Sequence, residues 1–426
     1  MSKYLITIFL FFALQNFAQD DNSMTFGSEI EDSVSFADST LPTVFDLRNS
    51  GRLSAVKTQP DGGCWTSATM SSVESVFRTF GYGEYELSDI NLKLFNGFDS
   101  TRNTNGNHYM ATAYFSRGSG PLIKNSETDS LYSIAPKTAA YITDARYLPD
   151  NPGLIKNVIM KFGAVFSMIY FKKSEFDAVS NVWYNDSEKI NHVIDLVGWN
   201  DTMRTKSGRG VWIVQNSLGE KFGDKGFFYI PYHETNILKY NAIWNKWIPY
   251  DSLAKIYYYD TLGTYFSYGY NDSLIYGLVK YIAASDCEIL KIGTSVNHQN
   301  TRIYSAVYKD FDRATGTLTG KSATIQEKFC KYPGYYTFDL QKPVRLKKGE
   351  EFYILMRYIV PGASMPMPVE KYVKDYSDPV LSSGKCFINH DIEKWPDAWI
   401  EAGENAEYDF LRFNLCVKAY CVRLVP

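Results

Sequence analysis

The chain has 426 residues, which at a typical domain size of about 150 residues corresponds to two or three domains. Its 44 Lys and Arg nearly balance 47 Asp and Glu, and a net charge of −3 argues against a nucleic-acid binder that relies on a broad basic surface. Apolar residues make up 45% of the chain, which excludes a mostly disordered protein. The chain has only five His and six Cys, so we expect no metal and no cofactor. The cysteines are unevenly placed, because Cys64 lies alone and the other five lie at or beyond Cys287.

The beginning of the chain has the pattern of a secretory signal peptide. Lys3 precedes an apolar run from Leu5 to Leu14, and the small Ala18 stands before the expected cleavage point. This run is too short to span a hydrocarbon core, which needs roughly 20 residues. We therefore expect residues 1–18 to be removed, leaving a secreted or periplasmic protein without an integral membrane segment, in a compartment that permits disulfides.

Residues 19–43 are polar and acidic. They contain six acidic residues with Ser and Thr between them and almost no apolar periodicity. We expect a flexible lead-in or a very short propeptide here, because the segment is too short and too polar to fold as an inhibitory prodomain.

Residues 44–249 mix helical and strand periodicities, which predicts an α+β domain. The spacing of apolar residues predicts helices over 64–80 and 154–162. Strand-like runs follow at 164–171, 192–199, 210–216 and 226–230.

Residues 250–426 have few helical signals and predict an antiparallel β-sandwich. Short runs rich in Val, Ile, Tyr and Phe alternate with Gly, Pro, Asn and Asp, at 256–259, 289–293, 302–308, 335–340, 351–358 and 410–420. The five cysteines of this part allow at most two disulfides, and their pairing stays open. Cys416 and Cys421 are five residues apart, so on one regular strand they would face opposite sides and would not share a partner.

Cys64 is a candidate nucleophile. The pair Gly62 and Gly63 precedes it and the predicted helix follows it, so the thiol lies where unpaired backbone N–H groups and the helix dipole favour an anion. Such a position is expected to lower the pKa of the thiol. It is also the only cysteine of its domain, so no neighbouring thiol can lock it in a disulfide.

A thiolate nucleophile needs a proton partner, and His192 is our candidate. It opens the strand-like run His-Val-Ile-Asp-Leu-Val-Gly-Trp, from which an imidazole can project over a helix N-terminus and form a thiolate–imidazolium pair. Asn216 closes the next strand, and its amide oxygen can accept the ring N–H and orient the imidazole without adding a charge.

Five ordered motifs resemble the papain-like cysteine peptidases. They are Phe-Asp-Leu-Arg (45–48), Val-Lys-Thr-Gln (56–59), Gly-Cys-Trp (63–65), His-Val-Ile with Val-Gly-Trp-Asn (192–200), and Trp-Ile-Val-Gln-Asn-Ser (212–217). The resemblance implies a two-lobed catalytic domain that cleaves protein or peptide substrates. It assigns Cys64 as nucleophile, His192 as general base and acid, Asn216 as orienting residue and Gln59 as oxyanion donor. Gly63 and Trp65, which flank Cys64, are expected to contact the substrate.

A weaker resemblance concerns the wall of the substrate cleft. The stretch from Asn105 to Gly120 looks like the glycine-bearing wall of bacterial family members, and Gly106 is our candidate for close approach of the substrate backbone. A surface turn is the alternative. We expect His108 to be a loop residue near this wall without a catalytic part.

Departures from the family pattern concern the surroundings of the triad. Gln59 lies five positions before Cys64, whereas six is usual in the family, and Pro60 lies in the shortened loop. Leu218 and Phe222 stand where family members generally carry Trp, and Leu218 is expected to shield the Asn–His hydrogen bond less completely. These changes put oxyanion geometry and efficiency in question.

The sandwich resembles the lectin-like domain that follows some bacterial papain-like peptidases, through the run from Tyr257 to Cys421. This resemblance implies docking of a carbohydrate or surface ligand, although aromatic residues at strand spacing also serve as core. Three functions stay open: a secreted thiol endopeptidase acting through an acyl-enzyme; a catalytically weakened scaffold that binds peptides or glycans; and an amidase or transpeptidase with the same triad.

Overall fold

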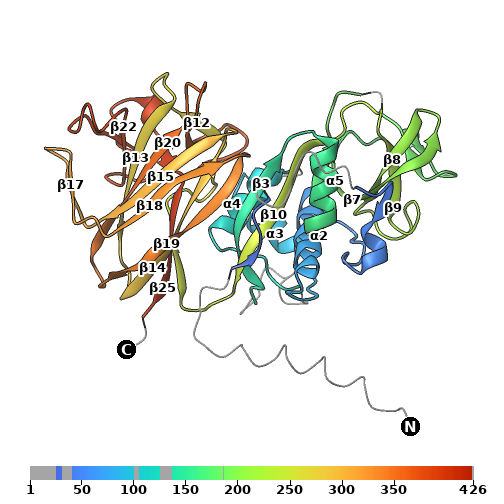
Figure 1. Ribbon diagram of the computed structural model, residues 1–426, viewed down its shortest axis with the longest axis horizontal. Coiled ribbons are helices and arrows are strands. Elements are labelled where there is room, and N and C mark those ends of the chain that lie inside the picture. The colour runs from blue at the N-terminus through green and yellow to red at the C-terminus, as the bar shows by residue number, and fades with distance from the viewer. Residues whose placement is uncertain (1–24, 31–40, 100–104, 125–136, 186, 425–426) are drawn as a thin grey trace, which may run out of the picture.

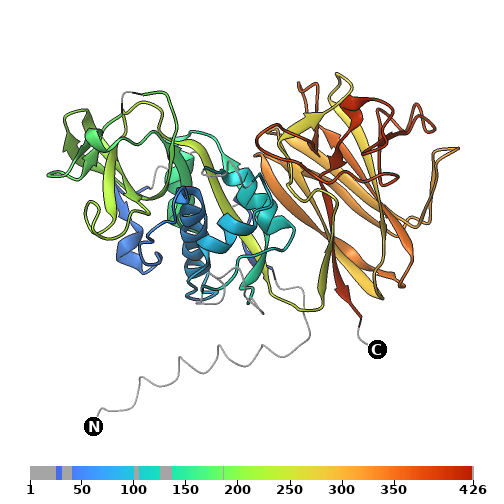
Figure 2. The same ribbon diagram turned by 180° about the vertical axis from the view of Figure 1, so that it is seen from behind.

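The computed structural model describes residues 25–30, 41–99, 105–124, 137–185 and 187–424, and the expected signal peptide lies outside them. Two parts lie side by side: an N-terminal part of helices and strands up to residue 249, and a C-terminal part of strands (Figure 1). The view from behind shows the same division, with the helices gathered in the N-terminal part (Figure 2). The predicted fold class, a papain-like α+β domain followed by a β-sandwich, is confirmed.

The helices of the N-terminal part begin at polar caps or at glycine. They are α2 (Cys64–Thr79), α3 (Asp89–Phe95), α4 (His108–Ser116) and α5 (Pro152–Phe162), with 3-10 turns η1 (Leu47–Ser50) and η2 (Lys173–Glu175). The predicted helices over 64–80 and 154–162 are confirmed. Asn151 caps α5 by accepting a hydrogen bond from the Leu154 N–H, and Pro152 supplies a helical φ without losing a donor.

The strands of the N-terminal part belong to one large sheet. They are β1 (Phe26–Gly27), β2 (Val44–Asp46), β3 (Ala140–Leu148), β4 (Val165–Ile169), β5 (Phe176–Asp177), β6 (Val182–Trp183), β7 (His192–Thr205), β8 (Gly208–Gln215), β9 (Phe227–Pro231) and β10 (Lys239–Pro249). The order β3-β10-β4-β7-β8-β9 places the predicted strands side by side, and α2 packs against β7 and β10. This packing brings the first turn of α2 close to the first residue of β7.

The C-terminal part is the predicted antiparallel sandwich. Its elements are β11 (Ala254–Tyr257), β12 (Phe266–Tyr268), β13 (Leu274–Ile282), β14 (Cys287–Val296), β15 (Thr301–Tyr308), β16 (Asp310–Asp312), β17 (Thr317–Thr319), β18 (Ala323–Cys330), β19 (Gly334–Leu346), β20 (Glu351–Ile359), β21 (Met367–Glu370), β22 (Cys386–Asn389), β23 (Ile400–Ala402), η3 (Asp409–Leu411), β24 (Asn414–Leu415) and β25 (Val417–Arg423). One layer is the sheet β18-β15-β20-β13-β22-β23, and the other contains β11, β25, β14 and β19. A core between the layers joins Ile292 of β14 to Ile354 of β20.

The two parts share a sheet. Strand β19 pairs with β3, with Gly334 opposite Arg146 and Tyr335 opposite Ala145, so hydrogen bonding runs from the N-terminal part into the sandwich. A thin yellow-green connection after β10 leads from the N-terminal part into the sandwich (Figure 1). The domain boundary between residues 249 and 250 therefore stays a prediction from the sequence, because one sheet continues from the N-terminal part into the sandwich.

The expectation of a flexible segment over 19–43 is wrong for residues 25–30. Strand β1 pairs with β10, and Ile30 is fully buried. Glu29 accepts hydrogen bonds from the buried Arg146 at 2.6 Å and from Lys246 at 2.5 Å. The segment is fixed because the Glu29 carboxylate pairs with two cations, Arg146 and Lys246, that share Asp144 as their other acidic partner. Among the described residues, no helix combines the length and apolar composition needed to cross a bilayer.

Candidate active site

Cys64 is the first residue of α2 and lies against the beginning of β7. Its side chain is nearly buried, with 6% of the residue exposed. The backbone N–H groups of Val193 and Trp65, together with its own, act on the thiol and lower its pKa. Because Val193 directly follows His192, the structure brings the predicted nucleophile and the predicted base to the same point.

The electrostatics of Cys64 differ from the prediction. Burial raises the pKa of the Cys64 thiol, and this effect outweighs the backbone N–H groups that lower it. Burial likewise lowers the pKa of His192, although the hydrogen bond from Asn216 opposes the shift. The expected lowering of the thiol pKa is therefore wrong for the unliganded protein, where desolvation favours a neutral thiol beside a neutral imidazole.

His192 and Asn216 are hydrogen-bonded to each other. The distance from His192 Nε2 to Asn216 Oδ1 is 2.9 Å, and the same Oδ1 accepts the Ser217 N–H at 2.9 Å. An amide oxygen only accepts, so Nε2 carries the ring proton and, in the neutral imidazole, Nδ1 is left with its lone pair. The pair forms because β7 and β8 are neighbours and each residue lies at a strand end.

Aromatic rings pack beside the imidazole. Phe171 lies 5.3 Å from His192 between ring centroids, and Phe222 lies 5.8 Å from Phe171. Leu218 is 39% exposed, whereas Asn216 is buried. Phe171 was not predicted as a site residue, because nothing distinguishes it at the end of an apolar run.

The shortened loop before Cys64 is closed by a tight turn. The Gly63 N–H donates to the Pro60 carbonyl at 2.7 Å, and a Cβ on Gly63 would lie 2.5 Å from the Pro60 ring. Gln59 is anchored on both sides, because its N–H donates to the Ser217 carbonyl at 2.8 Å and its Oε1 accepts from the Ser217 hydroxyl at 2.6 Å. Because the side-chain oxygen of Gln59 is bonded to Ser217, the Nε2 amide group is the end of the side chain that can donate a hydrogen bond.

A buried ion pair connects the segment that precedes Gln59 to α2. Lys57 Nζ lies 2.7 Å from Glu74 Oε1, and Glu74 is fully buried. Glu74 Oε1 also accepts the Leu87 N–H at 2.6 Å. Both residues were missed from the sequence, where a Lys two positions before Gln59 and a Glu in the middle of a helix are indistinguishable from surface charges.

Gly106 and Trp65 lie against each other in the cleft wall. A Cβ on Gly106 would be 2.2 Å from the Trp65 ring, and Trp65 is fully buried. The indole therefore supports the wall from behind, which corrects the expectation that Trp65 contacts substrate directly. The absence of a side chain at Gly106 is required by this packing, whatever approaches from the other side.

His108 is not a loop residue. It is the first residue of α4, is 3% exposed, and lies between Tyr109 and Tyr147, with ring centroids at 4.3 Å and 4.4 Å. Burial lowers the pKa of His108 to about 3, so the ring is neutral at physiological pH. Helix α4 escaped prediction because nearly all of its residues are apolar or small, which gives no helical periodicity.

The expected disulfides do not form. All six cysteines belong to the described residues, all are buried, and no disulfide joins them. Cys287 and Cys421 contact each other across β14 and β25, and the hydrogen bond from Cys421 lowers the pKa of Cys287 to about 7. Cys416 lies between β24 and β25, so it does not share one regular strand with Cys421.

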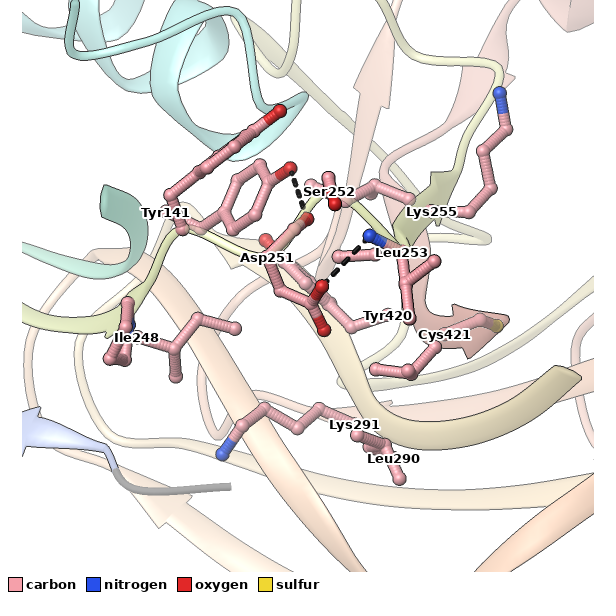
Figure 3. A pocket seen from close by; sticks show the side chains of 15 residues that line it. Tyr141, Ile248, Asp251, Ser252, Leu253, Lys255, Leu290, Lys291, Tyr420 and Cys421 are labelled. Atoms are coloured by element: carbon pink, nitrogen blue, oxygen red, sulfur yellow. Dashed lines mark hydrogen bonds between the residues drawn. The ribbon is translucent and has the colours of Figure 1, made fainter. Parts of the chain in front are cut away.

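A cavity of about 470 Å³ lies where β10 leads into β11. Figure 3 shows that its polar groups are used internally: the Tyr141 hydroxyl donates to the Asp251 carbonyl at 3.2 Å, and the Asp251 carboxylate accepts the Leu253 N–H at 2.8 Å. The ammonium of Lys291 points away from Asp251 in this view and bonds the Thr25 hydroxyl at 3.0 Å. None of the predicted site residues lines this cavity.

A thiol at a helix N-terminus, beside an imidazole held by an amide oxygen on an antiparallel sheet, defines the thiol hydrolase class. Residues 41–243 match the model of the papain family cysteine proteases, and residues 256–421 match the model of the lectin-like domain. The chain thus contains a peptidase domain (41–243) that belongs to the papain family, followed by a lectin-like domain (256–421).

Curated relatives share the peptidase domain. Mouse cathepsin M (Mus musculus) is 27% identical over 207 residues, which are 45% of this chain and 60% of the relative. Chicken cathepsin K (Gallus gallus) is 29% identical over 204 residues, 44% of this chain and 58% of the relative. The chain therefore covers less than two thirds of the length of these relatives.

A solved structure shares both domains. The cysteine protease and lectin-like domains of Cwp84, a surface layer associated protein of Clostridium difficile, superpose with a TM-score of 0.74 over 90% of this chain and 89% of that chain. The sequence identity is 18%, so this likeness concerns the fold.

Proposed function

We propose that the protein is a secreted cysteine endopeptidase that hydrolyses peptide bonds through a thioester acyl-enzyme. Cys64 is the nucleophile, His192 the general base and acid, and Asn216 the residue that orients the imidazole. The observation that carries the proposal is the 2.9 Å hydrogen bond from His192 to Asn216 beside a thiol at the first residue of α2.

The first half of the reaction forms the acyl-enzyme. His192 Nδ1 takes the proton of the Cys64 thiol while the sulfur attacks the scissile carbonyl carbon. The resulting oxyanion is stabilised by the backbone N–H of Cys64 and by Gln59 Nε2, whose other end the Ser217 hydroxyl holds. His192 then gives the proton to the leaving amine as the C–N bond breaks, which leaves a thioester.

The second half regenerates the thiol. His192 Nδ1 takes a proton from a water molecule that attacks the thioester carbonyl, and returns it to the Cys64 sulfur as the C–S bond breaks. The products are an amine and a carboxylic acid. The neutral pair favoured by burial suits this scheme, because proton transfer accompanies attack and no ion pair has to exist beforehand.

Export and docking are the other two parts of the proposal. Residues 1–18 direct secretion, and N-terminal sequencing of the exported protein would show cleavage after Ala18.

The lectin-like domain docks a carbohydrate or a surface, which is supported by exposed rings on it, among them Tyr408 stacked on Phe410 at 5.3 Å. Glycan binding that survives Tyr408→Ala with Phe410→Ala would contradict this site.

A catalytically weakened scaffold is the second candidate. The exposed Leu218 favours it, because water could reach the orienting hydrogen bond from that side. This alternative predicts that peptides bind the cleft and are not cut.

Peptide hydrolysis by matched cysteine variants separates the two functions. Cys64→Ala is expected to lower kcat/KM by at least about 1000-fold, since the nucleophile is lost. Cys386→Ala, at another buried cysteine, is the control and should keep wild-type activity. Equal hydrolysis by wild type and Cys64→Ala would overturn the endopeptidase, and tight binding without turnover in the wild type would establish the scaffold.

A further inference from the structure

A short turn of the lectin-like domain contacts the peptidase domain. It covers residues 371–377, directly after β21, and is closed by the pairing of Val373 with Ser377. The Tyr376 N–H donates to the Val373 carbonyl at 3.0 Å, and the Ser377 hydroxyl donates to the Lys371 carbonyl at 3.1 Å. These local hydrogen bonds give the turn a fixed shape.

The base of this turn is anchored inside the lectin-like domain. Glu370, the last residue of β21, is buried and pairs with Asn414 of β24. Its carboxyl group accepts hydrogen bonds from the Leu262 N–H and from the Asn414 side-chain amide. The turn therefore starts from a fixed point of the lectin-like domain.

Tyr376 inserts from the turn into the peptidase domain. Its ring packs against the hydrophobic core of that domain, with centroid distances of 5.0 Å to Phe98 and 4.9 Å to Tyr265. The Tyr376 carbonyl accepts the Asp99 N–H at 3.3 Å. Ring packing and this backbone bond together fix where the Tyr376 hydroxyl lies.

The Tyr376 hydroxyl meets Asn107, the residue that caps α4. Asn107 Nδ2 donates to the hydroxyl at 3.3 Å, and Asn107 Oδ1 accepts the Met110 N–H of α4 at 3.1 Å. Capping fixes the orientation of the side-chain amide, because its oxygen faces the first turn of the helix. Tyr376 thus gives the same side chain a second attachment, which comes from the other domain.

Asn107 directly follows Gly106, which lies in the cleft wall. A Cβ on Gly106 would lie 2.2 Å from the indole of Trp65, the residue after Cys64, so the wall is already in close contact behind Gly106. The backbone at Gly106 is therefore held by Trp65 from behind and by Asn107 at its end. A wall that is fixed before the substrate arrives costs less free energy to order on binding.

We propose that Tyr376 is a positioning residue for substrate binding, which holds Asn107 and thereby fixes the Gly106 wall along which an extended peptide substrate binds. The lectin-like domain then contributes to peptide affinity without touching the peptide. This proposal rests on the proposed endopeptidase function and adds to it that substrate binding depends on the second domain.

Removing only the hydroxyl tests the proposal. Tyr376→Phe keeps the ring contacts and deletes the hydrogen bond to Asn107; Tyr372→Phe, at an exposed ring of the same turn, is the matched control. The values of kcat and KM are measured separately on one peptide substrate. We expect Tyr376→Phe to raise KM about fivefold with kcat unchanged, which is the usual effect of one such hydrogen bond, and Tyr372→Phe to keep both values.

A second variant separates positioning of the wall from capping of α4. Asn107→Ser keeps a side-chain oxygen that can cap the helix and lacks the amide that reaches Tyr376. It should raise KM about as much as Tyr376→Phe, and the double variant should raise KM no further, because both substitutions delete the same hydrogen bond. Independent, multiplying increases in KM would overturn the proposal.

The remaining outcomes separate this proposal from the proposed function. An unchanged KM in Tyr376→Phe, an equal rise in Tyr372→Phe, or a lower unfolding temperature with kcat and KM unmoved would overturn the positioning role and leave the endopeptidase intact. If the wild type cuts nothing, the endopeptidase fails, and the Kd of the same peptide for Cys64→Ala protein replaces KM. Binding that Tyr376→Phe alone weakens supports the role; equal binding by both variants, or none, refutes it.

Discussion

The two domains bury their cysteines in different surroundings. In the lectin-like domain, burial together with the charges of Asp260 and Glu370 raises the pKa of Cys386 to about 12, and only the backbone of Leu415 opposes it. In the peptidase domain, burial also raises the pKa of Cys64, but three backbone N–H groups oppose it and His192 is adjacent in the fold. Burial alone therefore does not distinguish an inert thiol from a nucleophile; the groups that oppose burial do.

Removing the imidazole is expected to have the largest effect. His192→Ala should lower kcat/KM by about 1000-fold, because the Cys64 proton then has no acceptor. The exposed His233→Ala is the control and should retain activity. Measurement of kcat/KM on one peptide substrate suffices, and a His192→Ala enzyme within tenfold of wild type would show that Cys64 is activated by its backbone donors alone.

The Lys57–Glu74 pair is next. Lys57→Met should destabilise the peptidase domain by about 3 kcal/mol, because the Glu74 carboxyl stays buried without its cation. Denaturant unfolding measures this loss. Lys124→Met removes the cation of the exposed pair Lys124–Glu86, and this control should lower the free energy of unfolding by less than about 1 kcal/mol. Similar losses in the two variants would mean that burial of the Lys57–Glu74 pair does not increase the cost of losing its cation.

Asn216→Ala tests orientation. The hydrogen bond that His192 donates to Asn216 raises the pKa of His192, so its removal should move the imidazole titration to lower pH in NMR spectra. Misorientation should lower kcat by about 100-fold with little change in KM. A structural defect would instead lower the unfolding temperature and leave the His192 titration unmoved.

A further prediction concerns the pH dependence of the stability of the lectin-like domain. Burial raises the pKa of Glu370 to about 8, well above the value of 4.5 in an unfolded chain. Between these values the folded state holds a proton that the unfolded chain releases, so stability falls as pH rises from about 4.5 to about 8. In thermal unfolding, Glu370→Gln should flatten this slope, whereas Glu404→Gln at an exposed site should not. Parallel slopes in both variants would assign the effect to other groups.

Part of this architecture was predictable. The helical period after Cys64 predicted α2, and the strand-like runs at His192 and before Asn216 predicted β7 and β8. These elements could be predicted because their sequences are apolar along one face or along the whole length. They also bring together the three residues proposed for catalysis.

The features that were not predicted depend on contacts between residues far apart in the sequence, which a local sequence pattern does not indicate. Strand β3 is buried along its length although it contains Asp144 and Arg146, because Lys246, Glu29 and the sandwich neutralise and bond them. Phe171 became part of the site only through its position against His192. His108 and Asn297 line one pocket although 189 positions separate them in the sequence, and periodicity cannot predict such a contact.

The most direct test of the central claim is covalent labelling of the full-length protein with an epoxysuccinyl thiol inhibitor, followed by peptide mapping. We predict one adduct, at Cys64, which forms in step with loss of peptide hydrolysis and does not form in His192→Ala. Labelling of the lectin-like cysteines alone, or full hydrolysis after Cys64 is blocked, would contradict it.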